Sequence, residues 1–140
     1  MAALADAELS SSHEESTPPI RWSGEPWEWW RSLGSPVHVC SPMVDHSELA
    51  YRQLIRRHYL PNLDENKGAG ILCYTPMLHA KKFATDATYR AQRFVTCPEE
   101  LAAPGGLIAQ FCGDDARSLL AAAKLVQSSG ISAVDLNLGW

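Results

Sequence analysis

Several features are missing from this 140-residue sequence. It has no run of about 18 apolar residues, the length that a membrane-spanning helix needs. Its first 20 residues carry acidic side chains but no basic segment leading into an apolar one, so we expect neither a secretory signal nor a transit peptide. The net charge of −4 gives no overall electrostatic attraction for nucleic acid. Together these absences favour a cytoplasmic or nuclear protein.

Cysteines are few, and none is arranged for a metal. The four cysteines form no CxxC pair, and Cys40, Cys73 and Cys112 fall in short apolar runs. We therefore expect buried, reduced thiols and no metal site. The phosphate-binding patterns GxGxxG and GxxxxGK[ST] are also absent, so no phosphate motif indicates a nucleotide.

The length limits the fold. With 46% hydrophobic residues the chain can build one modest core. A complete (β/α)8 barrel needs roughly 200–250 residues, so a barrel interpretation implies a fragment. Composition divides the chain into a disordered tail over residues 1–21, a Trp-rich helix over 22–35 and an α/β region over 36–140.

Four of the five tryptophans lie within residues 22–33. A helix is expected here, because a Ser-Gly-Glu-Pro start signal precedes it and Gly34 follows it. Such a cluster is able to stack on nucleic-acid bases or to pack on a barrel surface. We favour packing, since a bulky indole seeks any apolar surface.

After Gly34 the pattern alternates between strand and helix. Strands are expected at residues 37–40, 71–74, 107–111 and 133–136. One helix begins near Asp45 and Ser47, and another at Asp114 and Asp115, while residues 78–104 predict one short helix and an irregular return. The basic pairs at 56–57 and 81–82 are expected to be solvated helix faces. The alternation predicts a parallel sheet of βαβ units, but the spacing fits both a barrel and a doubly wound open sheet.

Polar and sulfur-containing side chains follow the ends of these strands, where parallel α/β proteins bind ligands. An amide there is able to donate to and accept from a flat heterocycle, and methionine supplies an adaptable apolar floor for one. The candidate positions are Ser41, Pro42 and Met43, the matching residues Thr75, Pro76 and Met77, and the amides Gln110 and Asn137.

These positions carry a resemblance. The segment CSPMVDHSELAYRQLIRRH looks like the first βα unit of the tRNA-dihydrouridine synthases, and YTPMLHAKKF with DATYR is similar to the second unit of the eukaryotic type acting on uridines 16 and 17 of the tRNA D-loop. IAQFCGDDARSLLAAAKLV resembles the third unit, and AVDLNLG the fourth strand. The match covers about residues 27–139. It implies the N-terminal half, about four βα units, of a TIM-type (β/α)8 barrel.

The resemblance also implies a chemistry. Ser41, Pro42 and Met43 would line a pocket for FMN, Gln110 would hydrogen-bond its ring, and Asn137 would lie beside the substrate base. In the family, reduced FMN gives a hydride to C6 of a flipped-out uracil in tRNA, a cysteine protonates C5, and NADPH or NADH restores the flavin.

The sequence departs from the family at its last residue. Trp140 stands where the family has its catalytic cysteine, and the later phosphate loops and tRNA-binding domain are missing. Because four strands cannot close a barrel, we expect the chain alone to be inactive, to retain FMN poorly and to self-associate through open sheet edges. Two alternatives stay open: a non-catalytic truncated product or interaction fragment, and another FMN barrel such as a dihydroorotate dehydrogenase-like oxidoreductase.

Overall fold

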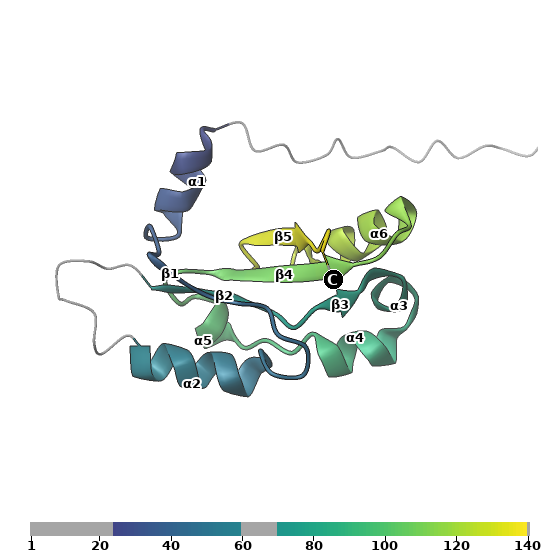
Figure 1. Ribbon diagram of the computed structural model, residues 1–140, viewed down its shortest axis with the longest axis horizontal. Coiled ribbons are helices and arrows are strands. Elements are labelled where there is room, and N and C mark those ends of the chain that lie inside the picture. Colours follow the sequence, from purple (N-terminus) through teal and green to yellow (C-terminus); the bar gives the residue numbers. More distant parts are fainter. Residues whose placement is uncertain (1–23, 60–69, 140) are drawn as a thin grey trace, which may run out of the picture.

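A computed structural model describes residues 24–59 and 70–139, whose elements are labelled in Figure 1. The predicted tail over residues 1–21, the connection over 60–69 and Trp140 lie outside the described residues. The strands are β1 (His38–Cys40), β2 (Ile71–Tyr74), β3 (Leu78–His79), β4 (Leu107–Cys112) and β5 (Ala133–Leu136). The helices are α1 (Pro26–Ser32), α2 (Leu49–Tyr59), α3 (Ala80–Thr85), α4 (Ala87–Arg93), α5 (Pro98–Leu101) and α6 (Ala116–Val126).

All five strands belong to one parallel sheet. β1 pairs with β2, and β2, β3 and β5 all pair with β4. β2 contacts the start of β4 at Leu107 and Ile108, whereas β3 contacts its end at Phe111 and Cys112. Since a strand has only two edges, β2 and β3 are successive parts of one extended passage along the same edge, and β5 occupies the other.

Between β2 and β3, a side chain takes part in the ladder with β4. The backbone N–H groups of Cys73 and Thr75 donate to the carbonyl oxygens of Gly106 and Ile108 at 3.2 and 2.9 Å. The Thr75 hydroxyl then accepts the backbone N–H of Gln110 at 3.1 Å and donates to the carbonyl oxygen of Pro76 at 2.9 Å. The side chain thus keeps the end of β2 attached to β4 while the backbone turns away.

The strand order decides between the two folds that the spacing allowed. Counting β2 and β3 together, each βα unit adds its strand on the same side of the preceding one, in the order β1, β2/β3, β4, β5. A doubly wound open sheet reverses direction after its first strand or strands, whereas a TIM-type barrel keeps one direction. The predicted α/β class and partial TIM-type barrel are confirmed.

Helices α2, α3 and α6 pack against one face of the sheet in two apolar clusters. Near α2, the core consists of Cys40, Ile71, Cys73 and Leu107 with Tyr51 and Ile55 against them. Near α3 and α6, it consists of Leu78, Ala80, Phe83, Ala109, Phe111, Ala122 and Val126. The predicted helix over the third connection is confirmed as α6, whose N-cap Asp115 accepts the N–H groups of Arg117 and Ser118.

Two predictions about the first and second connections are wrong. Residues 78–104 hold three short helices rather than one, because Asp86 ends α3 and also caps α4 by accepting the N–H of Tyr89. Arg56 is not solvated: it is 4% exposed and donates to the carbonyl oxygens of Ile71, Pro104 and Gly106, although Arg57 beside it is exposed.

The Trp-rich segment forms α1, which lies at the end of the sheet where the strands begin (Figure 1). Trp29 donates its indole N–H to the carbonyl oxygen of Ser132 at 3.3 Å, just before β5. Leu33 accepts the N–H of Gly105 at 2.9 Å. Gly105 has φ of 95°, and a Cβ there would lie 2.3 Å from the carbonyl oxygen of Ile71, so only glycine fits. Trp29 is half-buried, while Trp27 is 67% exposed. Packing of the tryptophans on a barrel surface stays a prediction.

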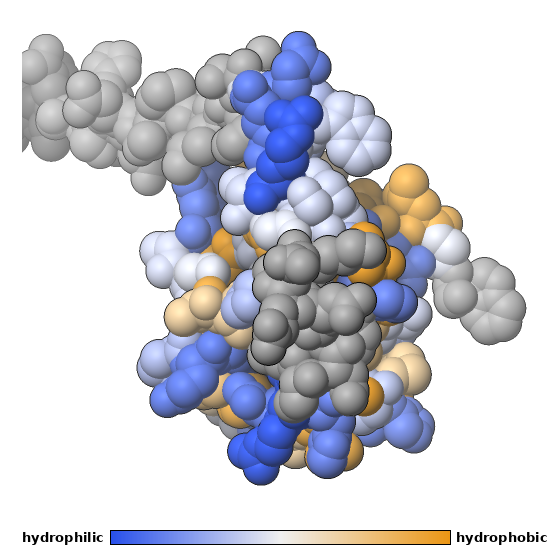
Figure 2. Space-filling model, turned by 90° about the vertical axis from the view of Figure 1, so that its left-hand side faces the viewer, coloured by the Kyte–Doolittle hydropathy of each residue, from blue (hydrophilic) through white to orange (hydrophobic). Residues whose placement is uncertain are grey.

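Figure 2 looks onto this end of the molecule. Hydrophilic residues cover most of it, and hydrophobic side chains gather on one flank. No described helix has the length and apolar character needed to cross a bilayer.

Candidate functional site

The strand register divides the sheet into a helix-covered face and an inner face. Paired residues on neighbouring strands point to the same side, and residues two apart share a side. Cys73 pairs with Leu107, and both pack towards α2. The residues that alternate with them therefore point to the inner face, which lines the interior when a barrel closes. They are Val39 on β1, Leu72 and Tyr74 on β2, Ile108 and Gln110 on β4, and Ala133 and Asp135 on β5.

This inner face changes character along the strands. Its first part is apolar, with Leu72 and Ile108 buried at 2% and 5% exposure. Towards the carboxyl ends it carries Tyr74, Gln110 and Asp135. The polar groups therefore gather at the edge where parallel barrels hold their active sites.

Gln110 and Asp135 form the central contact of this edge. Their Cα atoms are paired across β4 and β5, and Gln110 donates a hydrogen bond from Nε2 to Oδ2 of Asp135 at 2.7 Å. Gln110 is 9% exposed. The sequence analysis did not include Asp135, although its position two residues before Asn137 in a strand pattern would have placed it on the same face.

Tyr74 is a second residue that the sequence analysis missed. Burial, and then the charge of Asp135, raise the pKa of Tyr74 above its ordinary value. The phenol therefore stays protonated at neutral pH and keeps an O–H donor on the inner face.

Asn137 and the second Pro-Met turn meet at the same edge. The side-chain amide of Asn137 donates to the sulfur of Met77 at 3.0 Å, and its backbone N–H continues the ladder to the carbonyl oxygen of Phe111 at 2.9 Å. The end of β5 and the loop after β2 are thus brought together, as their places after strands led us to expect.

The first Pro-Met turn is held separately. The buried Ser47 hydroxyl accepts the backbone N–H of Met43 at 2.9 Å and donates to its carbonyl oxygen at 3.1 Å. Ser41 is exposed, and Pro42 and Met43 are half-buried. β1 is two strands away from β4, so this turn borders the edge without a hydrogen bond to Gln110. A ligand that contacts both this turn and Gln110 would therefore extend across the inner face.

The cysteines lie mostly away from this edge. Cys40 and Cys73 are buried under α2, and Cys97 precedes α5. Burial raises the pKa of Cys73 to about 12 despite the opposing effect of Arg56. Cys112 ends β4 and is half-buried. The described residues contain no cluster of three or more His, Cys, Asp or Glu side chains suited to a metal ion.

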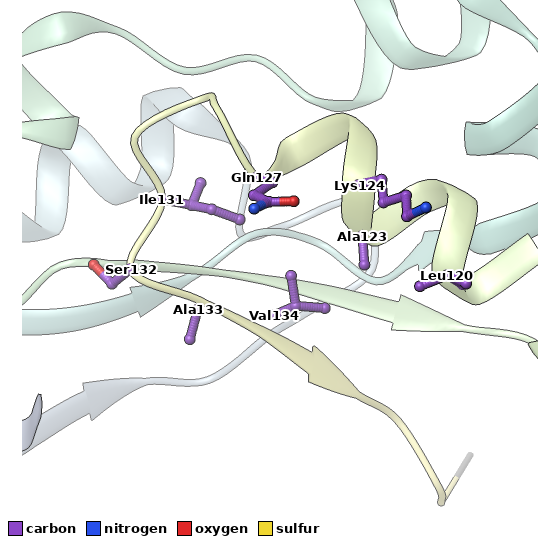
Figure 3. A pocket seen from close by; sticks show the side chains of 8 residues that line it. All are labelled: Leu120, Ala123, Lys124, Gln127, Ile131, Ser132, Ala133 and Val134. Atoms are coloured by element: carbon purple, nitrogen blue, oxygen red, sulfur yellow. The ribbon is translucent and has the colours of Figure 1, made fainter. Parts of the chain in front are cut away.

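A large cavity of the described part lies apart from this site. A hollow of about 500 Å³ opens between α6 and β5 (Figure 3). Apolar side chains such as Leu120, Ala123 and Val134 make up much of its wall. Val134 alternates with Asp135 on β5 and points to the helix-covered side, so the hollow and the Gln110 edge lie on opposite faces.

Comparison with known proteins places these features in a family. The model of the dihydrouridine synthase (Dus) family matches residues 39–140. A rat protein named tRNA-dihydrouridine(16/17) synthase [NAD(P)(+)]-like is 48% identical over 113 residues, which are 79% of this chain and 22% of the rat protein. The tRNA-dihydrouridine(16/17) synthase [NAD(P)(+)] of Saccharomyces cerevisiae is 45% identical over 76% of this chain and 22% of its own length.

A human protein named tRNA-dihydrouridine(20a/20b) synthase [NAD(P)+]-like is 36% identical over 82% of this chain and 31% of the human protein. The chain thus spans only about a fifth to a third of the length of these curated relatives. No solved structure matches it significantly.

Proposed function

This chain belongs to the dihydrouridine synthase family, and from that membership we propose that it supplies the first βα units of an enzyme that reduces uridine to 5,6-dihydrouridine in tRNA. The observation that carries the proposal is the polar edge around Gln110, Asp135 and Asn137, at the carboxyl ends of a barrel-type sheet. A tRNA substrate agrees with a cytoplasmic or nuclear location. The same proposal includes the division of the chain into a tail (1–21), a Trp-rich helix (22–35) and the partial barrel (36–140).

FMN is the proposed cofactor, and the chemistry of Gln110 fits it. One N–H of the amide is bound to Asp135, which leaves one N–H and the carbonyl oxygen for a ligand. The imide edge of an isoalloxazine ring offers a donor beside acceptors and so matches both groups. Ser41, Pro42 and Met43 would line the ring from β1, and Met43 gives it an apolar contact. FMN, when bound, supplies hydride transfer.

The chain's own residues would position the reactants. Asn137, at the end of β5, would hydrogen-bond the uracil base, since an amide matches its donor and acceptor groups. Tyr74 would keep a protonated phenol on the inner face. The names of the relatives include NAD(P)(+), which supports NADPH or NADH as the source of electrons.

We further propose that the chain by itself is inactive. In the described part, β1 and β5 each pair with only one strand, so these strands do not close a barrel. An unclosed barrel leaves water around the reacting groups and lets a flavin dissociate. The free edges of β1 and β5 would favour self-association at high concentration. The position that the resemblance assigns to a catalytic cysteine, Trp140, lies outside the described residues.

Two alternatives differ in their support. A non-catalytic interaction fragment agrees with the open edges and the exposed Trp27. The relatives named above give no support to a dihydroorotate dehydrogenase-like enzyme, because all of them are named as tRNA-dihydrouridine synthases or proteins like them.

The proposal is tested by the absorbance spectrum of the purified chain after incubation with FMN and desalting. A weak flavin band is expected, and Gln110→Ala should weaken FMN binding by about tenfold, as for the loss of two hydrogen bonds. Gln92→Ala, on the exposed face of α4, is the matched control and should bind as the unaltered chain does. Equal binding by the Gln110 and Gln92 variants would remove Gln110 from the site.

A further inference from the structure

Asp135 is a carboxylate on the inner face whose role the proposed function does not assign. It lies on β5 directly across from Gln110 on β4 and accepts the Gln110 Nε2 hydrogen bond at 2.7 Å. In the part of the chain that the structure describes, it has no salt-bridge partner. A carboxylate in this position requires an explanation, because a charge in a partly buried site costs free energy.

The chemistry of the contact fixes the direction of the Gln110 amide. An ionised carboxylate only accepts hydrogen bonds. The NH2 end of the amide must therefore face Asp135, and the carbonyl oxygen must point away from it. An uncharged donor-acceptor partner in place of Asp135 would tolerate both orientations.

The backbone of Gln110 is fixed as well. Its N–H donates to the Thr75 hydroxyl at 3.1 Å, and Thr75 is 1% exposed. With the main chain held from β2 and the side chain held from β5, the free groups of the amide are its oxygen and its second N–H.

We infer that Asp135 is a positioning residue, which holds the Gln110 amide so that its carbonyl oxygen and second N–H face the imide edge of a flavin. This inference rests on the proposed function, which supplies the flavin. Asp135 acts through Gln110 and need not touch the ligand. Pre-orienting the amide removes part of the entropy that binding would otherwise cost.

The first test observes the Gln110 side-chain amide by NMR in the absence of any ligand. In the NMR spectrum of the full chain, assigned through Gln110→Ala, the two Gln110 side-chain NH2 protons should have widely separated chemical shifts, because one of them is hydrogen-bonded to Asp135. Asp135→Asn should narrow that separation, whereas Asp114→Asn, at an exposed position before α6, should leave it unchanged. A Gln110 amide that is insensitive to both variants would overturn the inference.

The second test uses flavin binding to determine how the Gln110 amide is oriented. Asp135→Asn should weaken FMN binding about five- to tenfold, as for one misdirected hydrogen-bonding group. FMN methylated at N3 lacks the imide donor, so its affinity should be low and should hardly differ between the chain and Asp135→Asn. An equal loss of affinity for both flavins in Asp135→Asn would show a merely structural role and would overturn the inference.

The two tests separate this inference from the proposed function. If the unaltered chain binds neither flavin, the proposed flavin site of this chain fails, and the NMR signature still decides whether Asp135 directs Gln110. If FMN binds and the NMR signature is absent, the flavin site stands and the role of Asp135 is overturned. Thermal unfolding of Asp135→Asn checks that the variant is folded.

Discussion

Two buried polar clusters lie on opposite faces of the sheet, and they differ in how fully their hydrogen-bonding groups are used. On the helix-covered side, all three guanidinium nitrogens of Arg52 donate hydrogen bonds. They reach both carboxylate oxygens of Glu100, at 2.6 and 2.9 Å, and the carbonyl oxygens of Ser47 and Val95. Arg52 and Glu100 are 1% and 0% exposed.

On the inner face, Gln110 uses one N–H towards Asp135, and within the described residues its amide oxygen accepts no hydrogen bond. The comparison shows two uses of buried polarity. The Arg52 cluster satisfies itself and ties α2 to α5 and the loop before it, whereas the Gln110 cluster keeps groups available for a ligand. Three substitutions and one pair of ligands test this difference.

The largest effect is expected from breaking the satisfied cluster. Arg52→Ala leaves the Glu100 carboxylate buried without its partner, which should lower the free energy of unfolding by about 3–5 kcal/mol. Chemical denaturation of the chain measures this loss. Arg57→Ala, on the exposed face of the same helix, should change stability by less than about 0.5 kcal/mol. Similar small losses for both variants would contradict a structural role for the cluster.

The second prediction concerns pH on the helix-covered side. Burial raises the pKa of Cys73 from 9.0 to about 12. Between these values the folded chain holds a proton that the unfolded chain releases, so stability is intact below about pH 9 and falls as the pH rises towards 12. Cys73→Ala should lose less stability between pH 8 and about 10.5 than the unaltered chain. Parallel pH profiles would show that the thiol does not contribute.

The third prediction concerns Thr75, which touches both the ladder and Gln110. Thr75→Val keeps the shape but removes the acceptor of the Gln110 N–H, which should cost about 1–3 kcal/mol of unfolding free energy. The same change should release the backbone of Gln110 and speed its amide hydrogen exchange. Unchanged exchange at Gln110 would mean that another group replaces the hydroxyl.

The smallest effect on binding is expected from removing the phosphate group of FMN, that is, from replacing FMN with riboflavin. Ser41, Pro42, Met43 and Gln110 carry no positive charge, so they offer the phosphate no charge-assisted hydrogen bond. Riboflavin and FMN should therefore bind this chain with affinities within about twofold of each other. Equilibrium titration of flavin fluorescence measures both. Much tighter binding of FMN would reveal a phosphate contact in this chain.

The sequence predicted the four strand positions and α6 because their apolar patterns are regular and their caps are local. It did not predict β3 or the division of residues 78–104 into α3, α4 and α5, since elements of two to seven residues have too few positions to show a period. The burial of Arg56 was also missed, because an arginine on a helix carries no mark of the carbonyl groups that will surround it.

The candidate site was predicted in part. Gln110 and Asn137 stood out as amides in apolar strands, and the structure places both at the carboxyl edge. Tyr74 emerged only from the register, which brings β2 and β4 side by side, whereas Asp135 was overlooked although it lies two residues before Asn137 in a strand pattern. Their significance depends on neighbours that are distant in sequence. The roles of Ser41, Pro42 and Met43 stay predictions.

The contact between Trp29 and Ser132 has a consequence for the order of folding. It joins residues 103 positions apart and bridges α1 to the start of β5. Contacts so distant in sequence close a long loop and form slowly, whereas the βα units close on nearby residues. We therefore expect α1 to dock last, after β4 and β5 are in place. A change in tryptophan fluorescence should then follow, rather than accompany, the main gain of circular dichroism during refolding.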